Sequence, residues 1–216
     1  MKKFLAVFTL FVISLNFSAK ALDLPKYYKF PENYLKGKFY DSTKDFFIVA
    51  TDKLNDSRFK NAVIIMLDHD EKGAVGVVIN KPIGIFTLGS LLKNLNDENI
   101  EEKKIYNMKL PIYWGGPLDN NKIFIIHSKD YKNNNTKNYK NVSITSDYKA
   151  LLDIAQKKGP MNSLVVVGLS AWTVGQLDGE IDKGHWNLSE VSEDILFEKN
   201  NENKHQMATK NSFVRL

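Results

Sequence analysis

Three short segments of this chain are apolar at almost every position, and they restrict its possible folds more than any other feature. They are 62–67 (AVIIML), 74–79 (AVGVVI) and 163–167 (SLVVV). A strand with one exposed face alternates apolar and polar residues, whereas a continuous apolar run indicates a strand that is covered on both faces. We therefore expect a sheet whose central strands are buried on both faces.

Further strands and helices are predicted around these segments. Leucines recur at the spacing of an amphipathic helix over 87–95, and Thr87 is the expected N-cap. The other predicted elements are strands at 46–50, 112–114 and 122–127, a helix at 147–158 capped by Ser146, a helix at 171–181, a hairpin turn at 68–73 and a mobile, asparagine-rich loop at 129–140. Hairpins beside helices favour the α+β class over a doubly wound sheet.

The composition narrows the chemistry that a functional site can use. The chain has 216 residues, 43% of them hydrophobic and 25% charged, with no cysteine and four histidines. This length predicts one domain with a core that needs no disulfide. Without cysteine there is no thiolate nucleophile and no cysteine-ligated metal. His69 lies between Asp68 and Asp70 but without a second histidine at metal-binding spacing. We expect neither a metal ion nor a cofactor.

The first 21 residues have the features of a signal peptide. Lys2 and Lys3 precede an apolar run over 4–17, and Ala19-Lys20-Ala21 is an A-x-A cleavage signature. As a helix the apolar run would be about 21 Å long, which is short of a bilayer core of roughly 30 Å, so no transmembrane segment is expected after cleavage.

This interpretation divides the chain into four parts. They are a signal peptide (1–21), an N-terminal arm or linker (22–45), the main domain (46–198) and a polar C-terminal tail (199–216). A cleaved signal peptide predicts a periplasmic or secreted protein, and the alternative is a cytoplasmic one.

The charge of the chain argues against specific DNA binding. The net charge is +5, and cleavage after residue 21 would remove three lysines and no acidic residue, which leaves +2. Arg58 and Arg215 are the only arginines, although bidentate recognition of guanine and phosphate is chiefly the role of arginine. A lysine-rich, solvated surface accounts for this basicity.

Many ordered motifs resemble the YqgE/AlgH family of bacterial proteins. The densest are Gly168-Leu169-Ser170-Ala171-Trp172 and Gly175-Gln176-Leu177-Asp178-x-Glu180-Ile181, followed by Trp186. The others are Leu54-x-Asp56-x-x-Phe59, Ala62-Val63, His69, Gly73-Ala74-x-Gly76, Asn80-Lys81-Pro82, Gly115-Gly116-Pro117-Leu118, Phe124 to His127, Ser146-Asp147 and Asp194-Ile195-Leu196-Phe197. The resemblance covers about residues 46–198. It departs from the family in the leader and arm before the first strand, and in Asp178, where the family often has glutamate.

The resemblance implies a fold and leaves the function open. It implies a single α+β domain with a bifurcated mixed sheet, partly closed into a small barrel, and helices packed outside. The family is mostly uncharacterised and mostly cytoplasmic, and some members are labelled regulators of alginate synthesis. The leading hypothesis is a non-enzymatic binding or regulatory protein with an unknown protein or small-molecule partner. The alternatives are an unrecognised hydrolase that uses Ser170 or the histidines, and a transcriptional regulator that binds nucleic acid weakly.

Ser170 lies between a predicted strand and a predicted helix, as the nucleophile of a hydrolase elbow does. That elbow needs glycine two positions after the serine because the turn is crowded, and Trp172 occupies this position. Asp182 and His185 are the conceivable partners, but nothing in the sequence aims them at Ser170. The alternative interpretation is that Gly168 ends the strand and Ser170 caps the helix. No catalytic residue is assigned.

The candidate binding site combines two turns with an aromatic helix. Its predicted residues are Asn80, Lys81, Gly115, Gly116, Trp172, Gln176 and Trp186. The two turns are either purely architectural or line a groove in which aromatic, amide and lysine side chains bind a peptide or small ligand. Trp172 and Gln176 are four residues apart and are expected on one face of one helix. Trp172 would anchor that helix, while Gln176 would serve the site or satisfy buried backbone groups.

Overall fold

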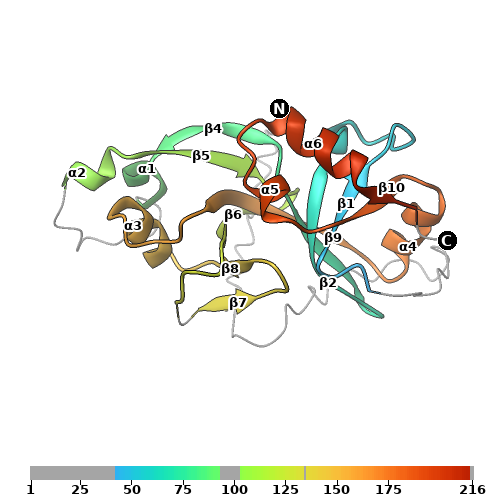
Figure 1. Ribbon diagram of the computed structural model, residues 1–216, viewed down its shortest axis with the longest axis horizontal. Coiled ribbons are helices and arrows are strands. Elements are labelled where there is room, and N and C mark those ends of the chain that lie inside the picture. The colour runs from blue at the N-terminus through green and yellow to red at the C-terminus, as the bar shows by residue number, and fades with distance from the viewer. Residues whose placement is uncertain (1–41, 93–102, 134, 215–216) are drawn as a thin grey trace, which may run out of the picture.

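In the computed structural model, β9 (Ser163–Trp172) is one of the longest strands, and it pairs with three other strands. All parts of the sheet are therefore joined through β9. The structure describes residues 42–92, 103–133 and 135–214. The first half of β9 pairs in parallel with β5 (Lys109–Trp114), and β6 (Leu118–His127) pairs with β9 antiparallel up to Leu169. The last three residues of β9 pair with β3 (Gly73–Val78). The sheet therefore branches along β9 (Figure 1).

Each branch continues outward through antiparallel pairs. From β3 the order is β2 (Val63–Asp70), β1 (Phe46–Ala50), β10 (Trp186–Glu190) and β11 (Ser212–Phe213). From β6 it is β8 (Ser143–Thr145) and β7 (Thr136–Asn138), and from β5 it is β4 (Pro82–Thr87).

The predicted partial closure into a barrel is wrong, although the mixed α/β single domain is confirmed. Among the described residues, the branches end at β11, β7 and β4, and each of these strands pairs with one neighbour. A barrel requires the last strand to pair with the first. Here the branches leave β9 separately, so their outer strands do not meet.

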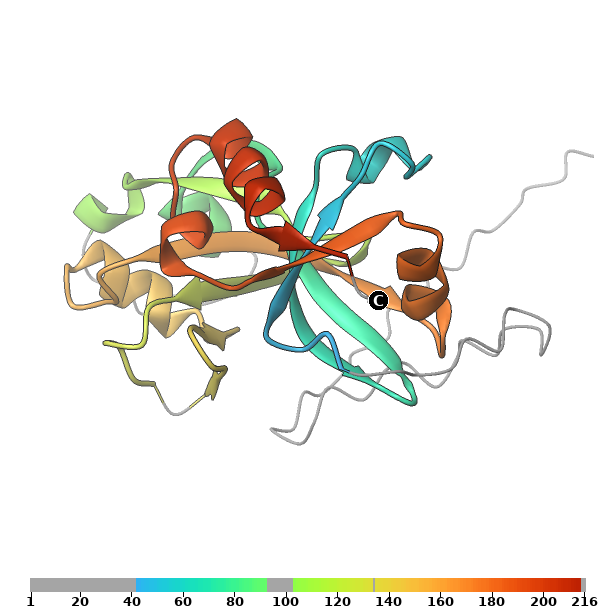
Figure 2. The same ribbon diagram turned by 45° about the vertical axis from the view of Figure 1, so that its right-hand side comes forward.

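The helices are short and lie around the two branches. They are η1 (Ser57–Phe59), α1 (Leu88–Leu92), α2 (Lys103–Tyr106), α3 (Lys149–Ala155), α4 (Gln176–Asp182), α5 (Glu193–Leu196) and α6 (Asn201–Lys210). No helix in the described ranges is both long and apolar enough to cross a bilayer. Figure 2 shows α6 and α4 on opposite sides of β2, so that the central strands are covered twice.

Burial on both faces confirms the expectation drawn from the apolar runs. Along β2, Val63 and Ile65 belong to one buried cluster, whereas Ile64 and Met66 belong to another. Side chains of a strand alternate between faces, so one continuous run supplies both cores. Burying one such side chain contributes about 1.5–3 kcal/mol, which explains why this run has no polar position.

The expected polar tail contains a packed helix and strand. Asn200 caps α6, and β11 pairs with β10. Lys204 is 0% exposed; its Nζ donates to the Ile79 carbonyl at 2.9 Å and lies 4.9 Å from the centre of the Tyr113 ring. Burial lowers the pKa of Lys204 to about 8, although nearby Glu198 opposes the shift. The long aliphatic stem of lysine can be buried with apolar residues, which a polarity pattern does not reveal.

Gly168 does not end β9, and the helix predicted at 171–181 starts later. The strand continues to Trp172, and α4 begins at Gln176 after Gly175, whose φ is 66°. Gly168 has a φ of 81°, a conformation that glycine adopts without strain, so the strand bends there and continues. Ser170 consequently lies inside a strand and does not cap a helix.

Smaller differences concern caps and loops. Thr87 is confirmed as a cap, because its Oγ1 accepts the Ser90 N–H at 3.2 Å. Ser146 is not the cap of α3; the Asp147 carboxylate instead accepts the Lys149 N–H at 2.9 Å. The predicted loop at 129–140 includes β7. The signal peptide and most of the predicted arm lie outside the described residues.

Candidate functional site

A cavity of about 170 Å³ lies where the last residues of β9 meet the 54–59 segment, α4 and β10. We call it the aromatic pocket. Its lining residues are Leu54, Asp56, Arg58, Phe59, Pro117, Ser170, Ala171, Trp172, Gln176, Glu180 and Trp186. Within the described ranges, Ser170–Trp172 pair only with β3, so other segments can pack beside the opposite edge of β9 and enclose the cavity there.

The carboxylate of Glu180 is the centre of the hydrogen bonding in the pocket. Its Oε2 accepts the indole N–H of Trp172 at 2.9 Å and that of Trp186 at 2.7 Å. Its Oε1 accepts the side-chain amide of Gln176 at 3.0 Å. The Gln176 carbonyl oxygen in turn accepts the backbone N–H and the hydroxyl of Thr173, both at 3.2 Å. One carboxylate therefore fixes the positions of two indole rings and the first turn of α4.

Aromatic rings in contact with one another form a wall beside this carboxylate. Trp172 and Trp186 meet edge to face with ring centres 6.2 Å apart, and Phe59 meets Trp186 in the same way at 6.0 Å. The Phe59 ring also lies 5.3 Å from that of Trp114. All three tryptophans of the chain thus lie in or next to the pocket. Such edge-to-face pairs add about 0.5–1.5 kcal/mol beyond the burial of their area.

The rim of the pocket carries an ion pair. Arg58 Nη2 lies 2.6 Å from Asp56 Oδ2, and Arg58 Nε donates to Asp56 Oδ1 at 3.0 Å. This hydrogen bonding holds the pKa of Asp56 below its usual value. The guanidinium also lies 5.7 Å from the centre of the Phe59 ring. Arg58 and Asp56 are therefore both charged and neutralise each other at the mouth.

The structure brings together three of the seven predicted site residues. Trp172, Gln176 and Trp186 line the pocket. The prediction that Trp172 and Gln176 share a helix is wrong, because Trp172 ends β9 and Gln176 begins α4. They meet through Glu180, which both side chains contact. Both side chains were predicted at one site from the sequence. What brings them together is their shared contact with Glu180, and not the spacing of residues along a helix.

The four residues of the two predicted turns lie outside the lining. Asn80 accepts the Val63 N–H at 2.9 Å and donates to the Asn61 carbonyl at 2.8 Å. Lys81 donates to the Lys60 carbonyl. These bonds hold the segment that follows Phe59, so they position the pocket wall without reaching the cavity.

The glycine turn lies behind the pocket, against β9. A Cβ at Gly115 would lie 2.2 Å from the Gly168 carbonyl oxygen, and one at Gly116 would lie 2.3 Å from Ser170 Oγ. Only a residue without a side chain allows this approach. Gly115 and Gly116 therefore bring Pro117 to the pocket and shape it from outside.

Among the described residues, no basic side chain is hydrogen-bonded to Ser170. Its side chain is on a residue that is 2% exposed, and its hydroxyl donates to the Gly115 carbonyl at 3.3 Å. His127 is completely buried, and burial lowers its pKa. Among the described residues, no group of three or more histidine, aspartate or glutamate side chains is arranged to hold a metal ion.

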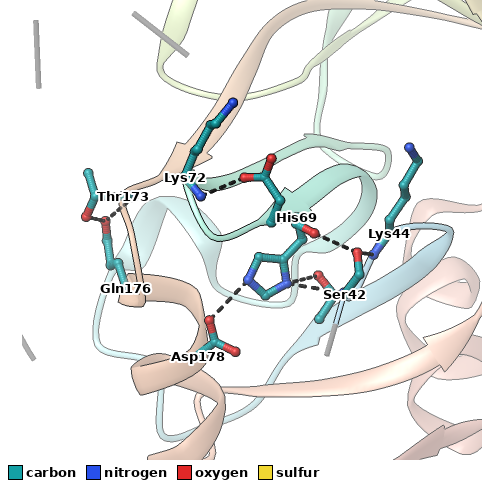
Figure 3. A network of polar contacts seen from close by, with 9 residues as sticks. Ser42, Lys44, His69, Lys72, Thr173, Gln176 and Asp178 are labelled. Carbon is teal, nitrogen blue, oxygen red and sulfur yellow. Dashed lines mark hydrogen bonds and ion pairs between the residues drawn. The ribbon is translucent and has the colours of Figure 1, made fainter. Parts of the chain in front are cut away.

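His69 belongs to a separate buried network on the other side of α4 (Figure 3). Its Nδ1 accepts the Thr43 backbone N–H at 3.2 Å, so the ring proton is on Nε2, which faces Asp178 Oδ2 at 3.1 Å. Thr43 Oγ1 also lies 3.0 Å from Nδ1, but Thr43 is 1% exposed. This order of hydroxyl, imidazole and carboxylate is closed to a substrate and ties residue 43 to β2 and α4.

The central residue of the pocket, Glu180, was not selected from the sequence. Phe59, Asp56 and Arg58 at the rim were also missed. A signal was present, because the motifs Leu54-x-Asp56-x-x-Phe59 and Gly175-Gln176-Leu177-Asp178-x-Glu180-Ile181 carry the family resemblance and both converge on this cavity. Taking the acidic members of those motifs together with the tryptophans would have identified the site.

Comparisons with known proteins agree with the resemblance. The AlgH-like family model matches residues 47–215. A UPF0301 protein of Rickettsia prowazekii is 38% identical over 154 residues, which are 70% of this chain and 78% of that protein. A UPF0301 protein of Rickettsia felis is 36% identical over 153 residues, with the same shares covered.

Two solved structures share the fold. The solution structure of the AlgH protein from Pseudomonas aeruginosa matches with a TM-score of 0.67 and 27% identity, over 78% of this chain and 88% of that one. The crystal structure of protein DIP2367 from Corynebacterium diphtheriae matches with a TM-score of 0.53 and 16% identity, over 72% of this chain and 79% of that one. The second likeness concerns the fold alone.

Proposed function

This chain belongs to the AlgH-like family, and from that premise we propose that it is a non-enzymatic binding protein whose ligand site is the aromatic pocket. One observation carries the proposal. Motifs far apart in the sequence, at 54–59, 168–172, 175–181 and residue 186, all contribute to the lining of the same cavity. These are motifs by which the chain resembles its family.

The size of the pocket suits one side-chain-sized group. Its volume of about 170 Å³ is close to that of an engineered cavity of about 150 Å³ that binds benzene. Pockets for drug-sized ligands are typically about 300–1,000 Å³. The ligand is therefore a small molecule, or a single side chain that a peptide or protein partner inserts.

The chemistry of the lining supports binding more than catalysis. The polar side chains are held by each other: Gln176 and both indoles donate to Glu180, and Arg58 is paired with Asp56. Among the lining residues there is no histidine or lysine, and the Ser170 hydroxyl faces a backbone carbonyl. Nucleophilic catalysis needs a nucleophile within reach of a base. Fixed donors and acceptors beside aromatic rings are what a recognition site requires.

The test is a fragment titration of the full chain, followed by NMR of the tryptophan indole N–H signals. The fragments are of side-chain size and carry neutral, anionic or cationic groups. Some of them should shift the indole N–H signals of Trp172 and Trp186 and leave the backbone N–H signals of α6 unchanged. Gln176→Ala removes one neutral hydrogen bond from the side-chain amide to the ligand, worth about 0.5–1.5 kcal/mol, and should weaken binding roughly 2- to 12-fold.

The matched control is Gln206→Ala, the same substitution at an exposed position of α6. It should leave the affinity for every fragment unchanged. If no fragment of any charge shifts the indole signals, the aromatic pocket is not a ligand site and the proposal fails.

A further inference from the structure

We infer that the group bound in the aromatic pocket is a positively charged nitrogen, such as an alkylammonium or methylammonium group. The inference rests on the proposed function, because it names the chemistry of the ligand for the same site. It is carried by the charges of the lining, by the two indole rings that donate to Glu180 and by a cation that already contacts one wall.

The lining has one negative charge without a cationic partner. Asp56 and Arg58 neutralise each other at 2.6 Å, which leaves Glu180. The three donors to Glu180 are indole and amide N–H groups, which are neutral. In the described part of the chain, none of the ion pairs includes Glu180. Neutral donors stabilise a carboxylate but do not cancel its charge, so the lining keeps a net negative charge that attracts a cation.

The aromatic wall complements the same kind of ligand. Indole faces are the strongest partners for cations among the aromatic side chains. Trp172 and Trp186 both donate to the Glu180 carboxylate, and a hydrogen bond to an ionised acceptor polarises the donor ring toward greater electron density. Carboxylate and rings therefore act on a bound cation in the same direction.

One cation already contacts this wall. The Arg58 guanidinium lies 5.7 Å from the centre of the Phe59 ring, within the distance at which cation–π attraction acts. Arg58 is at the rim, and its side chain is 60% exposed, so it covers the outer part of the wall. Phe59 in turn contacts Trp186, and Trp186 donates to Glu180, so a row of contacts connects Arg58 at the rim with the carboxylate.

An anionic ligand fits this pocket poorly. Arg58 is the only cationic side chain of the lining, and its Nε and Nη2 donors are already engaged by the Asp56 carboxylate. A carboxylate or phosphate would have to share this guanidinium with Asp56 and would also meet the charge of Glu180. An ammonium group meets neither obstacle.

The experiment compares probes that share shape and differ in charge. Tetramethylammonium, neutral tert-butanol and anionic pivalate are titrated into the full chain at constant ionic strength, with the indole N–H signals and tryptophan fluorescence as readouts. Tetramethylammonium should bind at least roughly tenfold more tightly than tert-butanol, because both the carboxylate and the rings favour the charge. Pivalate should not shift the signals. This comparison uses the unaltered chain, so it does not depend on any variant folding.

Two further measurements identify the residue and the source of the cation. Glu180→Gln should reduce the affinity for tetramethylammonium to about that for tert-butanol, whereas Glu190→Gln, the same change at an exposed position of β10, should have no effect. Nα-acetyl-lysine methylamide, whose side chain carries a free ammonium group, is compared with the uncharged Nα-acetyl-norleucine methylamide. A preference for lysine indicates a protein side chain as ligand, and binding of tetramethylammonium alone indicates a small molecule.

The outcomes separate this inference from the proposed function. If tert-butanol or pivalate shifts the indole signals as strongly as tetramethylammonium, the pocket binds ligands and the cation inference is overturned. The cation inference is also overturned if Glu180→Gln folds and keeps the full preference for tetramethylammonium. If no probe of any charge shifts the signals, the proposed function fails as well.

Discussion

The two faces of the β1–β2–β3 branch each hold a charged side chain, and they hold it in opposite ways. On the α6 face, Lys204 is fully buried against the Ile79 carbonyl and the Tyr113 ring. On the α4 face, Glu180 lies in an open pocket and accepts three neutral donors. Neither side chain is in an ion pair within the described residues.

This difference shows how a closed face and an open face use charge. A buried charge without an ion-pair partner raises the free energy of the folded state, and the lowered pKa of Lys204 reflects that cost. A charge in an open pocket keeps contact with solvent and remains available to a ligand. The closed face therefore predicts effects on stability that depend on pH, and the open face predicts effects on both stability and binding.

The largest expected effect is on the open face, where Trp172→Ala removes a side chain that is 5% exposed. Loss of a buried tryptophan costs about 3–5 kcal/mol, and this change also deprives Glu180 of one donor. Denaturant melts should show the decrease in the free energy of unfolding. The control is Val174→Ala, at a position that is 59% exposed, and it should change stability by less than about 0.5 kcal/mol. A Trp172→Ala protein as stable as the unaltered chain would show that the pocket wall is not part of the core.

The second effect concerns Lys204 and the closed face. Its pKa is about 8 in the folded protein, below its value of 10.5 in the unfolded chain, so the folded protein binds fewer protons between these two pH values. The free energy of unfolding contributed by Lys204 therefore rises as pH increases from about 8 to 10.5, by roughly 3 kcal/mol.

Lys204→Met isolates this contribution. Buried Tyr139, whose pKa burial raises, also affects stability at high pH, so the quantity to measure is the difference between the variant and the unaltered chain. Melts at a series of pH values should show that the variant lacks the rise. A variant whose stability follows the same pH dependence as the unaltered chain would mean that Lys204 titrates normally in the folded protein.

The smallest expected effect is that of Gln176→Ala on stability. The side chain is partly exposed, and water replaces its bonds to Glu180 and Thr173, so the loss should be about 1 kcal/mol. Its effect on ligand affinity should therefore be measurable in a folded protein. A destabilisation as large as that of Trp172→Ala would place Gln176 in the core and remove it from the binding residues.

Much of the fold could be predicted from local patterns. The apolar runs at 62–67 and 74–79 predicted strands that are buried on both faces, and β2 and β3 confirm this. Thr87 was recognised as a cap because capping depends on residues within one turn. Such features are decided by neighbours in the sequence, so the sequence reveals them.

The errors have a common physical cause. Gly168 was expected to end a strand, but a glycine also lets a strand bend and continue when a partner is present, and here β3 is that partner. The tail was predicted only as a polar segment, and its packing was not foreseen: α6 buries Lys204 and Ala208 against strands far away in the sequence. In both cases a distant segment determined the outcome.

The sequence alone determined the family and the buried strands, and it also selected Trp172, Gln176 and Trp186 as candidate binding residues. The tertiary structure alone decided that these three side chains converge on Glu180, that Phe59 and Arg58 complete the wall and rim, and that the two predicted turns support the pocket from outside. The reason is that a glutamate on a short helix looks like a solvated surface residue in the sequence. Its role arises from indole N–H groups that β9 and β10 bring to it from different parts of the sheet.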